Sequence, residues 1–100
     1  MKTWSGHGCW LPKAEAPAIR GALVGTDRIS FDLIKDGDPY AVALQVTAPG
    51  AATWKGTWRC EVDGSGGTVE ARLYTAADGG VVLSGRWVEE GDQVWFVELR

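Results

Sequence analysis

The sequence has little helical periodicity, no cluster of positive charge and no long apolar stretch. The longest helical candidate, Pro12 to Arg20, is interrupted by Pro12 and Pro17, so we expect few or no helices. Lysine and arginine occur singly in a chain of net charge -3, which disfavours nucleic acid and anionic membrane surfaces as partners. No stretch approaches the roughly 18 apolar residues of a membrane span, so we predict none.

Cysteine and histidine are also scarce, which disfavours a disulfide framework or a metal site. Cys60 alternates in step with Trp58 and so points inward, whereas Cys9 precedes Trp10 and so lies on the opposite face. We therefore expect two reduced thiols. His7 and Cys9 offer two metal ligands where structural zinc takes four, so no metal is predicted. With no apolar signal segment near the N-terminus, these features favour a cytoplasmic protein.

No catalytic or cofactor-binding motif is present. The chain has no Gly-x-Ser-x-Gly, no phosphate-binding loop and no second histidine that would serve as a base. The adjacent carboxylates Glu89 and Glu90 fall in a predicted turn, where we expect them to be solvated and not activated for catalysis. We therefore predict no catalytic residues, no cofactor and a protein that is not an enzyme.

Apolar residues recur with period two from about residue 18 to the end, which predicts seven strands in residues 18–100. Residues 1–17 are predicted to supply an eighth strand over Thr3 to Leu11, or only a connector. The predicted inward rows are Ile19-Gly21-Leu23, Ile29-Phe31-Leu33, Tyr40-Val42-Leu44-Val46, Trp54-Gly56-Trp58-Cys60-Val62, Val69-Ala71-Leu73, Val81-Leu83-Gly85-Trp87 and Trp95-Val97-Leu99.

The breaks between these rows are short and carry turn residues. Asp36-Gly37 and Asp78-Gly79 suit type I′ turns, and Gly25-Thr26 suits a type II′ turn. Parallel crossovers need a dozen or more residues, so the sheet is predicted to be a single antiparallel up-and-down meander.

The strand register is predicted from the apolar faces and the charges. Pairing Glu70 with Arg86 keeps one face apolar in that hairpin, and pairing Trp87 with Trp95 does the same in the last hairpin. With no helix to cover the apolar face, seven or eight strands must roll into a closed or nearly closed barrel, or fold over as a sandwich. We predict one all-β domain spanning residues 1–100.

Three of the six tryptophans have glycine two positions earlier: Gly8-Cys9-Trp10, Gly56-Thr57-Trp58 and Gly85-Arg86-Trp87. Because residues two apart share a strand face, each glycine leaves a gap beside an indole. Such a gap permits sharp coiling of the strand or lets an aromatic ring lie across the backbone.

A Gly-x-Trp near the N-terminus followed by an antiparallel meander resembles a compact relative of the calycin barrels, the lipocalin and avidin groups. The resemblance implies that Trp10 packs against a basic residue of the last strand, here Arg100, and closes one end of the barrel. It also implies binding of a small ligand in the lumen.

The inward tryptophans Trp54, Trp58, Trp87 and Trp95 leave two hypotheses open. They line a pocket for a small apolar or aromatic ligand, or they fill the core of a structural or protein-interaction domain.

Successive loops of a meander alternate between the two ends of a barrel, and one end collects acidic residues. Turn preference and solubility explain acidic loops in general, whereas a rim that attracts a basic protein partner is the functional interpretation. Lys35 is the one basic residue among these loops. The predicted acidic rim comprises Asp36, Asp38, Asp63, Glu89, Glu90 and Asp92.

Overall fold

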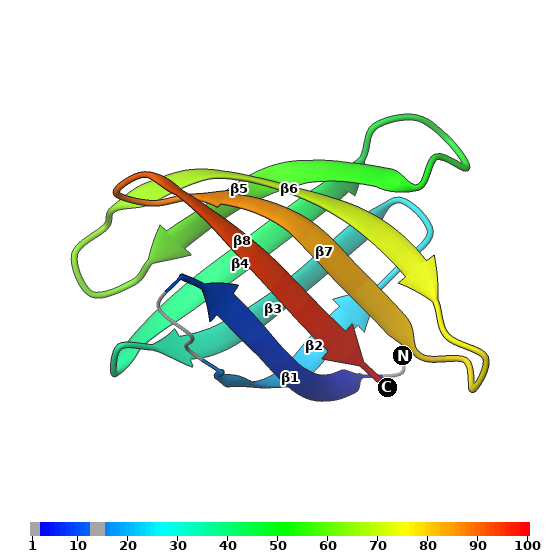
Figure 1. Cartoon of the computed structure of the whole chain (residues 1–100), viewed down its shortest axis with the longest axis horizontal. Helices are drawn as coiled ribbons and strands as arrows, with labels where there is room; N and C mark the ends of the chain where they lie inside the picture. The colour runs from blue at the N-terminus through cyan, green and yellow to red at the C-terminus, as the bar shows by residue number, and fades with distance from the viewer. Residues whose placement is uncertain (1–2, 13–15) are drawn as a thin grey trace.

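The computed structural model describes residues 3–12 and 16–100 and shows an all-β protein of eight antiparallel strands. Each strand pairs with the next and β1 pairs with β8, so the meander closes into a barrel (Figure 1). The predicted meander is confirmed, and the β1–β8 pairing excludes the folded-over sandwich. The strands are β1 (Trp4–Leu11), β2 (Ala18–Val24), β3 (Arg28–Lys35), β4 (Asp38–Val46), β5 (Thr53–Cys60), β6 (Gly66–Thr75), β7 (Val81–Val88) and β8 (Asp92–Leu99).

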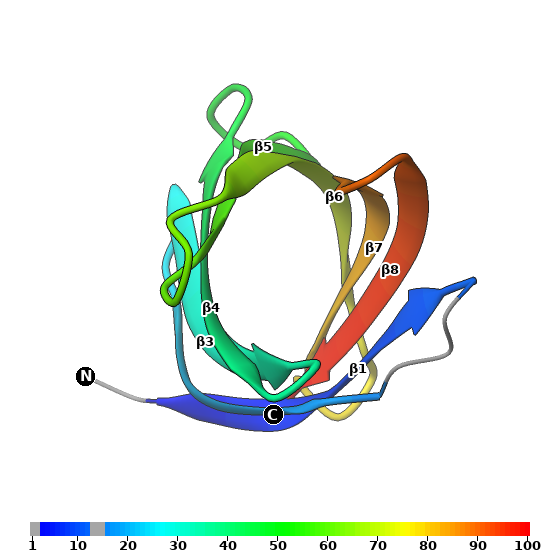
Figure 2. The same cartoon turned by 90° about the vertical axis from the view of Figure 1, so that its left-hand side faces the viewer.

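The loops gather at the two ends of the barrel. Those that follow β3, β5 and β7 lie together at the left-hand end in Figure 1, and Figure 2 looks into that end. The loops that follow β2, β4 and β6 lie at the other end, beside the start of β1 and the end of β8.

Aromatic side chains cross the middle of the barrel in contact with one another. Trp10, Trp87 and Trp95 have no exposed surface. Trp10 meets the edge of Trp87 at a centroid distance of 5.3 Å and stacks on Trp95 at 5.9 Å, while Trp58 stacks on Trp87 at 5.4 Å. Large aromatics contribute most of the apolar area that a core of this size can bury, so this cluster is the centre of the fold.

The glycines of the Gly-x-Trp pairs permit two kinds of close approach. A Cβ at Gly56 would overlap the carbonyl oxygen of Ala43, and one at Gly85 would overlap that of Glu70. At Gly8 the added atom would instead meet the ring of Trp10. Backbone coiling explains the first two positions, and an indole lying across its own strand explains the third.

The inward row predicted for β2 is wrong at Gly21 and Leu23. The ladder with β3 shifts between Arg20 and Leu23, and Gly21 adopts a positive φ of 66°. This β-bulge reverses the alternation, because it adds one residue to the strand. Ala22 is therefore buried, and Leu23 is 39% exposed.

The predicted end of β5 is also wrong, because Val62 is 65% exposed. The strand ends at Cys60, whose carbonyl accepts a hydrogen bond from Gly64 N in a tight turn. Val62 thus lies in the loop, beyond the inward row.

One predicted register is confirmed and the other is wrong. Glu70 does lie opposite Arg86, but Trp95 lies opposite Gly85 rather than Trp87. The shift by two positions results from a loop in which Glu90 and Gly91 both have positive φ, so that Val88 pairs with Asp92.

Of the three predicted turn types, the one at Asp36-Gly37 is confirmed and the other two are wrong. Asp36 and Gly37 have φ of 54° and 81°, the pair of positive values that a type I′ turn requires. Gly25 is not left-handed, since a longer loop closes there through Gly25 N donating to Arg28 O. At Asp78-Gly79 only the glycine is left-handed, and the carboxylate of Asp78 accepts a hydrogen bond from Gly80 N.

Both cysteines are free thiols, as predicted. Cys60 is buried inside the barrel, while Cys9 is half-buried and adjacent to the inward Trp10. The structure thus confirms that the two thiols lie on opposite faces of the wall. The part of the chain that the structure describes has no helix long and apolar enough to cross a membrane.

Replacing Gly85 by Ala is expected to destabilise the barrel by about 2 to 3 kcal/mol, because the new methyl group forces the strand away from the carbonyl of Glu70. Urea unfolding followed by tryptophan fluorescence measures the change. Gly50→Ala is the control, since Gly50 has a positive φ but open space around it, and about 1 kcal/mol is expected there. Equal losses in the two variants would contradict the close-approach explanation.

Candidate functional site

A polar cluster lies inside the barrel at the end that carries the loops after β3, β5 and β7. Lys35 is the last residue of β3, Tyr40 lies in β4, Trp87 in β7, and Glu89 directly follows β7. Gln93, near the start of β8, is 6% exposed and also points inward. The cluster therefore joins four strands at the point where the aromatic core ends.

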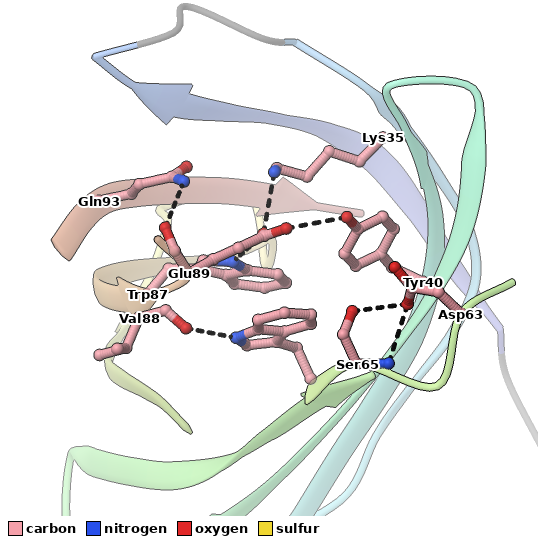
Figure 3. Close-up of polar contacts among 9 residues, drawn as sticks. Lys35, Tyr40, Asp63, Ser65, Trp87, Val88, Glu89 and Gln93 are labelled. Atoms are coloured by element: carbon pink, nitrogen blue, oxygen red, sulfur yellow. Dashed lines mark hydrogen bonds and ion pairs between the residues drawn. The ribbon is translucent and has the colours of Figure 1, made fainter. Parts of the chain in front are cut away.

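The carboxylate of Glu89 is the centre of this cluster (Figure 3). Its Oε1 accepts hydrogen bonds from Lys35 Nζ at 3.0 Å and Trp87 Nε1 at 2.9 Å, and its Oε2 accepts one from Tyr40 OH at 2.9 Å. The backbone carbonyl of Glu89 also accepts a bond from Gln93 Nε2 at 3.2 Å. One residue thus receives donors from β3, β4, β7 and β8.

Lys35 is a fully buried cation, with none of its side chain exposed, while 18% of the Glu89 side chain is exposed. The ammonium nitrogen also lies 5.4 Å from the centre of the Tyr40 ring, within the range of a cation–π contact. A buried ammonium is costly unless it is paired and hydrogen-bonded, so the ion pair with Glu89 helps to stabilise Lys35 inside the barrel.

The protonation of the cluster follows from these contacts. Burial alone would raise the pKa of Glu89, but the hydrogen bonds from Trp87, Lys35 and Tyr40, with the charge of Lys35, outweigh it and lower that pKa. Burial, then the hydrogen bond to Glu89 and its negative charge, raise the pKa of Tyr40 well above its ordinary value. The cluster is thus a carboxylate with an ammonium and a neutral phenol.

Above the cluster the barrel opens into a hollow of about 560 Å³. Tyr40, Trp58 and Glu89 lie at its base, and the loops after β3, β5 and β7 form its sides. We call this hollow and its rim the acidic mouth, because five carboxylates line it: Asp36, Asp38, Asp63, Glu89 and Glu90.

The structure brings five of the six predicted rim residues to the acidic mouth, although they differ in surroundings. Asp63 accepts hydrogen bonds from Ser65 N and Ser65 Oγ, which lower the pKa of its carboxyl. Asp92 lies opposite Val88 at the start of β8 and pairs with Arg86 at 3.7 Å. Glu89 departs from the prediction of an ordinary, solvated carboxylate, since it is half-buried and holds Lys35.

The four tryptophans predicted to bind a ligand all point inward and have little or no exposed surface. Trp54 and Trp58 are each 4% exposed, and Trp87 and Trp95 are fully buried. Trp58 Nε1 donates to the carbonyl of Val88 at 2.9 Å, and Trp95 Nε1 donates to that of Glu70 at the same distance. Of the four, only Trp58 lines the acidic mouth.

Trp10 and Arg100 do not form the barrel-closing pair that the calycin resemblance implied. Trp10 lies opposite Trp95, whereas the backbone of Arg100 pairs with Ser5 at the far end of the same two strands. The guanidinium of Arg100 instead bonds to Asp78 at 2.7 Å and to Glu98. Its side chain is 58% exposed, because Arg100 follows the inward Leu99.

The pairing of Lys35 with Glu89 was not predicted, although the sequence holds a signal for it. Lys35 continues the inward row of Phe31 and Leu33, and Glu89 is two residues beyond the inward Trp87. Gln93 continues the last inward row in the same way. The alternation thus places opposite charges inside the same end of the barrel, provided that charged residues at strand ends are not assumed to face solvent.

The chemistry available at this end is electrostatic attraction. No three His, Cys, Asp or Glu side chains among residues 3–12 and 16–100 are close enough together to hold a metal ion. The carboxylates are spread around the opening rather than convergent on a point. A concave surface whose charged groups are all negative raises the local concentration of cations.

No family model, curated protein or solved structure matches this chain. The function is therefore inferred from the geometry of the site.

Replacing Glu89 by Gln is expected to destabilise the barrel by about 3 to 5 kcal/mol, because it removes the carboxylate that lies 3.0 Å from the buried ammonium of Lys35. Chemical denaturation measures this change. The double variant Lys35→Met/Glu89→Gln should regain most of the loss, since it removes both charges. A double variant as unstable as Glu89→Gln would contradict the charge-pairing explanation.

The lowered pKa of Glu89 also predicts a dependence of stability on pH. The folded pKa lies below the ordinary value of 4.5, so the contribution of Glu89 is fully present above about pH 4.5 and is lost as the pH falls through the folded pKa. The wild type should lose stability below pH 4.5 more steeply than Lys35→Met/Glu89→Gln does. Parallel acid profiles from thermal unfolding would show that Glu89 is not linked in this way.

Proposed function

We propose that this barrel is a non-catalytic binding domain that meets a basic segment of a partner protein at the acidic mouth. The observation that carries the proposal is the gathering of carboxylates from three separate loops around one hollow. Asp36, Asp38 and Glu90 form no ion pair with any residue that the structure describes, so their charges remain available to a partner.

The shape of the mouth favours a peptide segment over a single ion. The hollow of about 560 Å³ has room for one or two long side chains, and the carboxylates are distributed around it. Several lysines or arginines along one segment would each meet a carboxylate, with one inserted above Tyr40 and Trp58. Aromatic edges beside carboxylates also suit the apolar stems of such side chains.

A small ligand in the lumen, as the likeness to the calycin barrels implies, is the second candidate. Trp10 Nε1 and Trp54 Nε1 are buried without a hydrogen-bond partner within the described part of the chain, and each could donate to a ligand. Such a ligand would have to displace packed indoles, since Trp87 and Trp95 are fully buried. The cytoplasmic location stays a prediction.

A fluorescein-labelled tetralysine peptide tests the proposal by anisotropy. We expect binding at low ionic strength that weakens as salt rises, because exposed charges are screened beyond about 10 Å at 0.1 M. The triple variant Asp36→Asn/Asp38→Asn/Glu90→Gln should lower the affinity by about tenfold, since each exposed pair contributes up to about 1 kcal/mol.

The matched control removes three exposed carboxylates that lie away from the mouth: Asp27→Asn/Asp32→Asn/Glu70→Gln. Both triple variants lose the same charge. Equal loss of affinity in the two would mean that net charge, and not the acidic mouth, attracts the peptide.

Tryptophan fluorescence separates the second candidate from the first. Anilinonaphthalene sulfonate, used as an apolar aromatic probe, should leave the indole emission of the folded protein unchanged if the lumen is closed. Saturable quenching, with the peptide not binding, would favour the lumen ligand over the acidic mouth.

A further inference from the structure

Lysine and arginine are scattered along the sequence, but the barrel brings two of them together on its outer wall. Arg28 is the first residue of β3, Lys55 lies near the start of β5, and β4 runs between these strands. Gln45 of β4 lies opposite both residues. Adjacent strands are about 4.8 Å apart, so the Cα atoms of Arg28 and Lys55 are about 10 Å apart. Two side chains of this length can therefore converge on one ligand above Gln45.

A hollow of about 420 Å³ lies between these two side chains. The neighbouring row across the same three strands is Ser30, Ala43 and Thr57. Ala43 is the central residue of that row, and its single methyl group leaves the space above it open. We call this feature the basic hollow, and its polar side chains are those of Arg28, Ser30, Gln45, Lys55 and Thr57.

Both cations of the basic hollow are available to a ligand. Neither Arg28 nor Lys55 forms an ion pair with any other residue that the structure describes. None of the described residues that line the hollow is acidic. Glu70 of β6 lies opposite Lys55 on the side away from the hollow, and it also lies opposite Arg86. The hollow therefore carries two positive charges without a carboxylate of its own.

Neutral hydrogen-bonding groups accompany the two cations. Ser30 and Thr57 contribute hydroxyls, and Gln45 contributes a side-chain amide. Within the described ranges, none of these three side chains donates or accepts a hydrogen bond. The basic hollow thus combines two free cations with three free polar side chains around a small central residue.

We propose that the basic hollow binds the phosphate group of a small phosphate monoester. Near pH 7 such a group carries close to two negative charges and three acceptor oxygens. The guanidinium of Arg28 fits two of these oxygens side by side, and the ammonium of Lys55 pairs with the remaining charge. A carboxylate ligand, with one charge, would leave one cation unpaired.

The size of the hollow and its number of charges favour a small molecule. Affinity for a nucleic acid depends on neutralising many phosphates of the backbone, and two cations are too few for that. The hollow is larger than a phosphate group needs, so Ser30, Gln45 and Thr57 are left to bind hydroxyl groups in the rest of the ligand. The basic hollow shares no lining residue with the acidic mouth, so the two sites are separate.

Titration of the full chain with glycerol 3-phosphate, followed by nuclear magnetic resonance at constant ionic strength, tests the proposal. At about pH 7, where the ligand is close to a dianion, the signals of the Gln45 side-chain amide and the Arg28 Nε–H should shift saturably. We expect a dissociation constant of about 1 to 10 mM, since both cations are exposed to solvent. Glycerol should leave both signals unchanged, and inorganic phosphate should bind more weakly because it lacks the hydroxyl groups.

Two variants separate the hollow from the net charge of the protein. Arg28→Gln/Lys55→Gln should raise the dissociation constant by at least about tenfold, since it removes both cations. The matched control, Arg20→Gln/Arg72→Gln, removes two exposed arginines that lie outside the hollow, and it should change the constant by less than about twofold. Ala43→Leu keeps every charge but fills the hollow, so it should also weaken binding.

Four results would each overturn the proposal. The first is a wild type without saturable shifts at Gln45 and Arg28, and the second is an equal response to glycerol. Equal weakening in the two double variants would show that net charge alone attracts the ligand. Undiminished binding by Ala43→Leu would show that the phosphate does not lie in the hollow. Inorganic phosphate that binds as tightly as glycerol 3-phosphate would overturn the assignment to a monoester. All five substituted residues are exposed, and the dispersion of the amide signals verifies that each variant is folded.

Discussion

The space inside a closed eight-stranded barrel is the constraint on which the rest of this structure depends. A lumen of that size holds packed side chains or one small ligand, and here indoles occupy it. Two of the indoles lie against glycines, Trp10 against Gly8 and Trp58 against Gly67, where a Cβ would meet the ring. At Gly85 the missing Cβ lets the carbonyl of Glu70 approach the strand, and the same carbonyl accepts the hydrogen bond of Trp95. Glycine and tryptophan positions are thus parts of one packing solution.

Closing the barrel also accounts for the polar cluster at the acidic mouth. Inward positions continue to the end of every strand, and at this end they include Lys35 and Gln93 instead of apolar residues. The side-chain donors of these two residues are buried away from water, and the indole N–H of Trp87 is buried as well. Glu89 accepts hydrogen bonds from all three, two through its carboxylate and one through its backbone carbonyl. It thereby joins elements that are far apart in the sequence.

Much of the fold was predictable because period-two alternation depends only on which side chains are apolar. Seven of the eight strands and most inward rows follow from it, whereas the alternation did not distinguish a strand from a connector in residues 1–17. A register shifted by two residues keeps every side chain on its own face, so the pattern could not distinguish Trp87 opposite Trp95 from Gly85 opposite Trp95. The backbone of Glu90 and Gly91 decides between them. At Gly21 a single left-handed residue reverses the alternation, and no apolar pattern encodes that choice.

The acidic rim and the buried ion pair differ in predictability for a related reason. The meander alone determines which loops share an end of the barrel, so the rim could be predicted without knowing where any side chain points. That Glu89 points inward while Glu90 points outward depends on the local course of the chain after β7, where Trp87 and Val88 set the alternation.

This distinction also divides the carboxylates by role. Glu89 is occupied by Lys35, Tyr40 and Trp87, so a basic ligand that took it would have to displace these donors from a half-buried carboxylate. Asp36, Asp38 and Glu90 form no ion pair with the residues that the structure describes. A partner can therefore be attracted by the rim without loosening the barrel, because the charge that stabilises the structure and the charges that face solvent belong to different residues.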